Sequence, residues 1–234
     1  MFTHKLCSIE LVELNEKTIH GIRYYEIDGE LFPSVTSILS IQSTERLEIW
    51  RKNMGAEVAN YESRRSAERG KIFHQICEDY LNNKDVYKHQ NKVLSFALFN
   101  MIKKHVDRID NIYKIEQKLY SKKYKIAGRT DCIAEFDGLL SIIDFKTSNR
   151  SKSPDLLMIH SIQETAYAIM WEELTGMLID QIVTLVSCEN GETQIHVTKP
   201  HFFKEKLNRC IKEFLIHQKF QSERESSKES SLIV

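Results

Sequence analysis

The dipeptide Asp137-Gly138 separates two runs rich in β-forming residues, at 123–136 and 139–148. A two-residue connection of this type favours a β-hairpin, because both of its positions need a positive φ that Asp and Gly tolerate. Such a turn also fixes the register of the two strands. With Phe136 and Leu139 paired next to the turn, counting back along both strands places Asp131 directly opposite Asp144.

This register brings two acids and a lysine together. Facing residues have Cβ atoms about 4.5–5.5 Å apart, and strand alternation places Lys146 on the same face as Asp144. Two facing carboxylates repel each other unless positive charge lies nearby. Lys146 can supply one charge, and a divalent cation held by Asp131 and Asp144 would supply two. The spacing therefore suggests a metal site with a lysine beside it.

A surface hairpin whose charges face water is the alternative. Leu140, Ile142 and Ile133 share the face of the acids, which makes a fully solvated face the weaker interpretation. A three-residue loop would break the register, because a slip by one residue turns side chains to the other face. Lys146 can likewise be an edge-strand lysine, or it can orient or deprotonate an attacking water and stabilise charge on a phosphate.

The remaining chain predicts an α/β protein in an α+β arrangement. An N-terminal β-hairpin is expected around Asp28-Gly29, and the region 1–109 otherwise reads as strands and helices, with a sheet and helices over 110–220. We expect one domain over 1–220, followed by a polar, serine-rich and disordered tail at 221–234. Strands are expected at 7–14, 112–121, 123–136, 139–148, 180–188 and 193–198, and helices at 44–53, 55–83, 90–109, 154–176 and 201–220.

The composition narrows the function classes. Lys+Arg and Asp+Glu both number 33, so an argument for nucleic-acid binding must be local. The 5 cysteines are scattered and form no CxxC pair, which argues against a zinc or iron–sulfur centre. No apolar run approaches the length of a membrane span or resembles a signal peptide. A reduced, cytoplasmic protein is therefore expected.

Five stretches resemble one family in the expected order. They are "LFPSVTSIL" (31–39), "RGKIFHQICEDYL" (69–81), "IEQKLYSKKYKIAGRTDCI" (115–133), "IIDFKTS" (142–148) and "QETAY" (163–167). Together they resemble the PD-(D/E)xK nuclease superfamily, and within it the RecB-type branch with its small phage and mitochondrial single-strand DNA exonucleases. The resemblance implies a restriction-endonuclease-like core, in which helices flank a central mixed β-sheet.

The resemblance also implies roles for particular residues. Glu116 is either a second-metal or water-mediated ligand or the cross-strand partner of a lysine, and Glu78 is either a partner of the histidine or a solvated helix acid. The implied metal ligands are His74, Asp131, Asp144 and the backbone carbonyl of Phe145, and the implied catalytic residues are Lys146, Asp131, Asp144 and Gln163.

Cations and tyrosines flank the proposed site. Such a mixture suits a single strand, whose phosphates follow the cations while its bases stack on aromatic rings. The alternatives are a lysine-rich solvated strand and a solvated helix face. The predicted substrate-binding residues are Arg69, Lys122, Lys123, Tyr124, Arg129, Thr147, Ser148 and Tyr167.

The function expected from these features is a Mg²⁺-dependent DNA exonuclease in which Mn²⁺ can substitute. It would act on free ends of single-stranded DNA during replication, recombination or repair, in a phage-like setting and alongside proteins of those processes. The cysteine cluster of iron–sulfur relatives is missing from the sequence. A structure-specific endonuclease on the same fold and a non-catalytic DNA-binding module are the alternatives.

Overall fold

A five-stranded mixed sheet forms the centre of the protein. The computed structural model describes residues 1–6 and 13–231, so most of the strand expected at 7–14 lies outside the described residues. The strands follow the order β4-β5-β6-β7-β8, and only β6 and β7 run parallel. The mixed sheet expected from the sequence is thus confirmed. Its strands are β4 (Ile109–Ser121), β5 (Ile126–Phe136), β6 (Leu139–Ser148), β7 (Gln181–Cys188) and β8 (Thr193–Thr198).

The predicted hairpin joins β5 to β6. Asp137 and Gly138 have φ values of 53° and 79°, as the turn requires. The cross-strand pairs run from Phe136–Leu139 to Cys132–Ile143, in the register that the sequence predicts. Next to the last pair, the Asp131 carboxylate accepts a hydrogen bond from the Phe145 backbone amide (2.8 Å). At the end of the hairpin away from the turn, the Asp131 carboxylate is therefore held against the backbone of β6.

Helices cover both faces of the sheet, because alternate residues of each strand point to opposite sides. On one face, Ile142 packs in a core with Tyr167 and Trp171 of helix α5. On the other, Ile143 packs in a core with Phe73 of α3. Helix α5 (Pro154–Thr175) also makes the crossover that the parallel pair β6–β7 requires. The other helices are α1 (Val35–Ser40), α2 (Thr44–Met54), α3 (Ala56–Leu81), α4 (Val93–Val106) and α6 (Lys204–Ser231), with short 3₁₀ turns at Ile41–Ser43, Tyr87–His89 and Pro200–Phe203.

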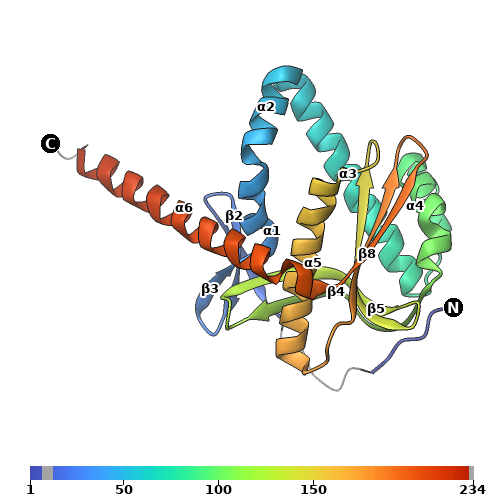
Figure 1. Cartoon of the computed structure of the whole chain (residues 1–234). Helices are drawn as coiled ribbons and strands as arrows, with labels where there is room; N and C mark the ends of the chain where they lie inside the picture. Colours follow the sequence, from blue (N-terminus) through green and yellow to red (C-terminus); the bar gives the residue numbers. More distant parts are fainter. Residues whose placement is uncertain (7–12, 232–234) are drawn as a thin grey trace.

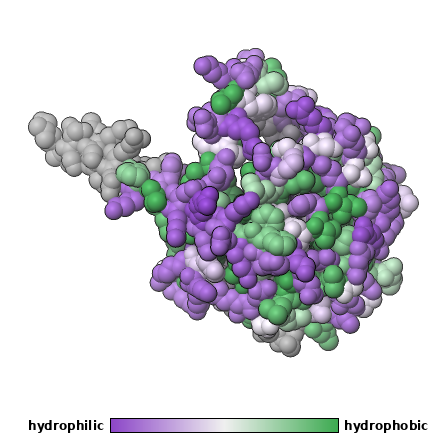
Figure 2. All heavy atoms as spheres, in the orientation of Figure 1, coloured by the Kyte–Doolittle hydropathy of each residue, from purple (hydrophilic) through white to green (hydrophobic). Residues whose placement is uncertain are grey.

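The last helix is longer than the sequence suggests. Helix α6 continues to Ser231 and projects from the body, so most of the tail expected to be disordered from residue 221 is helical (Figure 1). Extending an existing helix needs no new nucleus, and the three glutamates, one arginine and one lysine at 221–231 favour helix, although the tail is rich in serine. No helix in the described part of the chain is both long and apolar enough to cross a membrane. Hydrophilic residues cover most of the face in Figure 2.

A small N-terminal sheet lies against β5. Its strands β1 (Asn15–Ile19), β2 (Ile22–Ile27) and β3 (Glu30–Pro33) form an antiparallel meander, which contains the expected hairpin at Asp28-Gly29. Tyr25 and Phe32 of this sheet pack against Ala127 of β5, and a β-bridge joins Ser34 to the same alanine. The packing brings the N-terminal residues close to the strand that carries Asp131.

Candidate metal centre and active site

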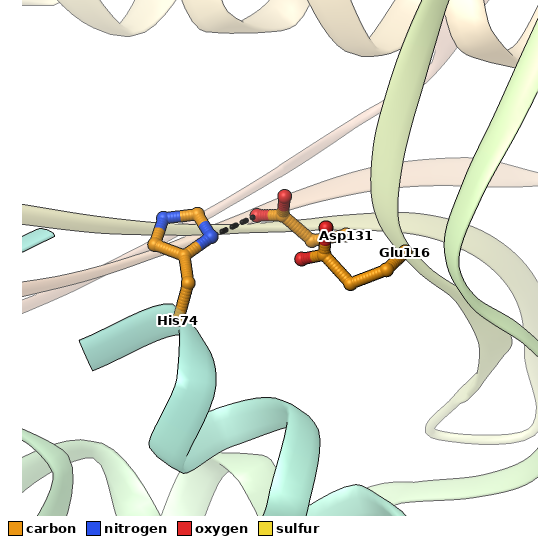
Figure 3. Close-up of side chains that lie close together, drawn as sticks. All are labelled: His74, Glu116 and Asp131. Carbon is orange, nitrogen blue, oxygen red and sulfur yellow. Dashed lines mark ion pairs between the residues drawn. The ribbon is translucent and has the colours of Figure 1, made fainter. Parts of the chain in front are cut away.

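Three donor side chains from separate elements meet in one cavity. His74 comes from α3, Glu116 from β4 and Asp131 from β5, and one ligand atom from each lies within 4.8 Å of the other two (Figure 3). Within this group, His74 Nδ1 lies 3.4 Å from Asp131 Oδ2. The cavity has a volume of about 420 Å³. Two carboxylates and an imidazole so arranged are a donor set that fits a divalent cation.

Glu116 adopts a backbone conformation that is uncommon for its residue type. Its φ is 51°, although it lies within a β-strand. Its carboxylate forms an ion pair with Arg129 Nε across the strand pair (3.0 Å). The sequence left Glu116 as either a ligand or the partner of a lysine. In the structure it belongs to the donor group and its cross-strand partner is an arginine.

Asp144 and Lys146 form a close pair beside the donor group. Lys146 Nζ lies 2.5 Å from the Asp144 carboxylate, which is almost fully buried. Gln163 Nε2 lies 3.5 Å from Asp144 Oδ1 and donates to the Tyr167 hydroxyl (3.1 Å). The predicted catalytic residues of β6 and α5 are therefore side by side. Their roles, and ligation by Asp144 or by the Phe145 carbonyl, stay predictions.

Burial and neighbouring charges shift the pKa values of these groups in opposite directions. Burial raises the pKa of Asp131, but the charges of His74 and Lys146 outweigh burial and hold it below its ordinary value. Burial lowers the pKa of His74, and the Asp131 charge reverses that effect and raises it. Burial raises the pKa of Asp144, and the charge of Lys146 counteracts this only in part. Without a bound cation, both shifts favour the charged forms, the carboxylate of Asp131 and the imidazolium of His74.

The position of the Tyr167 ring explains why residue 128 on β5 is a glycine. A Cβ atom on Gly128 would lie 2.7 Å from Tyr167 Cε1, so any larger residue would displace the ring. Tyr167 is buried, and its hydroxyl faces Gln163. Tyr167 also lines the cavity, and its predicted part in substrate binding stays a prediction.

The predicted substrate-binding residues fall into separate places. Arg129 lines the cavity, whereas Lys122, Lys123 and Tyr124 lie at the β4–β5 turn and are absent from its lining. Lys122 Nζ pairs with Asp28 (2.6 Å), and Lys123 Nζ lies 5.5 Å from the centre of the Tyr124 ring. The turn therefore holds its cations away from the donor group.

Two further residues predicted to act at the site, Arg69 and Glu78, lie in different surroundings: Arg69 is buried against β6, whereas Glu78 lines the cavity. Arg69, predicted to bind substrate, is buried, and its guanidinium donates to Thr147 Oγ1 (3.2 Å). The Thr147 hydroxyl, which was also predicted to bind substrate, is thus already used as the acceptor of this bond. Ser148 was predicted to bind substrate as well, and its backbone carbonyl accepts a hydrogen bond from the Glu189 amide. Glu78 lines the cavity, and its carboxylate accepts from Gln75 (3.1 Å).

Several cavity residues could not be found from the sequence pattern. Further parts of the wall come from the N-terminal sheet, the start of α1 and α3. Ser34 and Thr36 fall within the stretch "LFPSVTSIL" and Lys71 within "RGKIFHQICEDYL", whereas no motif of the sequence included Arg23 or Tyr25. The residues are Arg23, Tyr25, Ser34, Thr36 and Lys71.

Glu164 is a further buried acid near the site. Thr184 Oγ1 donates to Glu164 Oε1 (2.6 Å), and Glu164 Oε2 has no hydrogen-bond partner within the described residues. Burial and the Asp144 charge raise the pKa of Glu164 well above its ordinary value. The protonated form is therefore favoured in the folded protein.

Glu164→Gln should stabilise the protein more at about pH 8 than at about pH 5. The folded state holds the Glu164 proton more tightly than the unfolded state does, so the contribution of Glu164 to stability falls as pH rises above the unfolded pKa. Glutamine stays neutral and keeps the acceptor for Thr184. Urea unfolding at both pH values measures the effect. An equal change at the two pH values would show that Glu164 is not protonated in the fold.

Fold and site together define a nuclease. A model of the PD-(D/E)XK nuclease superfamily matches residues 42–210, which is more than half of the chain, and the chain belongs to that superfamily. Its members use divalent metal ions, in agreement with the donor group. The more specific assignment to the RecB-type branch stays a prediction.

The curated relatives of the chain carry one name. Mitochondrial genome maintenance exonuclease 1 of Homo sapiens is 26% identical over 136 residues, covering 54% of this chain and 39% of the relative. The proteins of that name from Mus musculus and Xenopus tropicalis are each 29% identical over 129 residues, covering 51% of this chain and 38% and 37% of the relatives. The chain thus spans about two fifths of the length of these relatives.

Proposed function

We propose that this chain is a Mg²⁺-dependent DNA exonuclease that hydrolyses phosphodiester bonds from free ends of single-stranded DNA. The observation that carries the proposal is one cavity in which His74, Glu116 and Asp131 converge beside the Asp144–Lys146 pair. Membership of the nuclease superfamily supports DNA hydrolysis. The name of the curated relatives supports the exonuclease class.

The donor set favours a hard cation. Carboxylates suit Mg²⁺ and Mn²⁺, and we expect His74, Asp131 and Asp144 to hold the ion, with Glu116 and the Phe145 carbonyl as further ligands. When bound, such an ion polarises a phosphoryl oxygen and lowers the pKa of water. We expect the Lys146 ammonium, which lies beside Asp144, to stabilise negative charge that develops on the phosphate.

The cavity wall supports a nucleic-acid ligand. Arg23, Lys71 and Arg129 line it, so cations lie around the donor group. Cations that follow a phosphate backbone are typical of nucleic-acid binding, and the preference for a single strand stays a prediction. A role in replication, recombination or repair, a phage-like setting and a cytoplasmic location remain predictions from the sequence.

Digestion of circular and linear single-stranded DNA tests the proposal. In Mg²⁺, the protein should degrade the linear strand and leave the circle intact, and EDTA should stop the reaction. Mn²⁺ should restore activity after EDTA treatment. Cleavage of circles would instead identify an endonuclease. Binding to both DNAs without cleavage in either metal would identify a non-catalytic DNA-binding module.

A further inference from the structure

Arg69 is committed to contacts inside the protein. Its side chain is 5% exposed and forms an ion pair with Glu189. Its guanidinium also donates to Asn149 Oδ1 (2.8 Å) and Thr147 Oγ1 (3.2 Å). Burying an arginine is unfavourable unless its charge is paired and its donors are used. Glu189, Asn149 and Thr147 meet both needs, so the guanidinium has protein partners in place of a DNA phosphate.

These partners connect three elements of the fold. Thr147 lies near the end of β6, Asn149 follows that strand, and Glu189 lies in the β7–β8 turn. The Glu189 amide donates to the Ser148 carbonyl (2.9 Å), which ties the turn to the end of β6. On the other side, Ser95 Oγ of α4 donates to the Arg69 carbonyl (3.1 Å). Helix α3 is thereby fixed to the sheet at the position of Arg69.

The two residues joined by this bond, Arg69 and Thr147, both lie near residues of the candidate active site along the chain. Arg69 precedes His74 on α3, and Thr147 directly follows Lys146 on β6. His74 reaches Asp131 at 3.4 Å only if α3 keeps its position on the sheet. We propose that Arg69, together with Glu189, is a positioning residue that sets the placement of His74 relative to the acids and lysine of the sheet. The inference rests on the proposed function, because it takes His74 as a metal ligand.

Arg65 provides a matched control. Arg65 Nη2 binds the other oxygen of Glu189 (2.5 Å), and Arg65 Nη1 lies 3.4 Å from Glu62. Its side chain is 32% exposed, and within the described part of the chain it has no hydrogen bond to β6. Replacing Arg65 therefore removes a cation from Glu189 and leaves the connection between α3 and β6 in place.

The test uses the full chain and Mn²⁺ alone as the probe. Arg69→Gln should weaken Mn²⁺ affinity in calorimetry by about 10–100-fold, the usual effect of losing a group that orients a ligand. The single-turnover rate at saturating DNA should fall, while DNA affinity should hardly change. Arg69→Lys should restore part of the loss, because it keeps the charge but lacks the planar fork of donors. Arg65→Gln should leave Mn²⁺ affinity at the wild-type value.

Other results would overturn the inference. Weaker DNA binding by Arg69→Gln, with unchanged Mn²⁺ affinity and saturated rate, would make Arg69 a DNA contact. Equal losses of Mn²⁺ affinity in Arg69→Gln and Arg65→Gln would attribute the effect to the charge on Glu189. If thermal melting shows that Arg69→Gln does not fold, Asn149→Ala removes one hydrogen bond and should still weaken Mn²⁺ binding severalfold; an unchanged affinity would contradict the proposal.

The wild-type chain separates the two levels of failure. A wild type that neither binds Mn²⁺ nor cleaves DNA would reject the proposed function, and the role of Arg69 with it. A wild type that does both, with Arg69→Gln and Asn149→Ala indistinguishable from it, would reject only the positioning role.

Discussion

Lys146→Met should lower the single-turnover rate of DNA cleavage by about 10²–10³-fold, or about 2.7–4 kcal/mol of barrier, the scale for losing one group that stabilises a transition state. Lys146 is the cation of β6 that shares a face with Asp144, and its ammonium lies 2.5 Å from that carboxylate. Burial lowers the pKa of Lys146, but the charges of Asp144 and Asp131 outweigh burial, so the pKa is raised and the charge is retained. Methionine keeps the length of the side chain and removes the charge. Rapid-quench kinetics at saturating DNA measures the rate.

The affinity for DNA should hardly change in Lys146→Met, since many cations share the phosphate contacts. Lys17→Met is the control, because Lys17 is exposed on β1 and its ion pair joins it to Glu26 of β2 (2.6 Å), outside the cavity lining. It should cleave at the wild-type rate. If Lys146→Met bound DNA much more weakly but cleaved saturating DNA at the wild-type rate, Lys146 would be a phosphate-binding residue and not a catalytic one.

Asp131→Asn should abolish cleavage and weaken Mn²⁺ affinity by more than about 100-fold, beyond the loss seen for groups that only orient a ligand. Asp131 belongs to the donor group, pairs with His74, and accepts from the Phe145 amide. Asparagine keeps an oxygen for that amide, so the strand pair should survive, but the negative charge is lost. Calorimetry with Mn²⁺ and thermal melting of the same samples separate loss of metal from loss of fold.

Glu135→Gln is the matched control for Asp131→Asn. Glu135 lies on the same strand, and its carboxylate accepts from Asn111 (2.8 Å) away from the cavity. Its replacement should leave both Mn²⁺ affinity and cleavage unchanged. Wild-type Mn²⁺ affinity in a folded Asp131→Asn variant would contradict the metal centre.

The sequence by itself determined the local part of the site. The Asp137-Gly138 turn fixes the register of β5 and β6, and strand alternation then places Lys146 beside Asp144. Turn chemistry and the two-residue period act between residues that are close in the chain, so they can be read without a structure. The main helices followed from periodicity, whereas the mixed sheet followed from the family resemblance that the motifs carry.

The family resemblance implied that His74 and Asp131 meet, but only the tertiary structure showed which distant residues share the cavity with them. The convergence of His74 and Glu116 on Asp131, and the contribution of Arg23 to the wall, depend on how α3 and the N-terminal sheet pack against β4 and β5. The same packing buried Arg69, which was predicted to contact DNA, against Thr147, Asn149 and Glu189. The charge of a residue can be read from the sequence, but the partner of that charge depends on contacts between elements far apart in the chain, and burial then makes pairing obligatory.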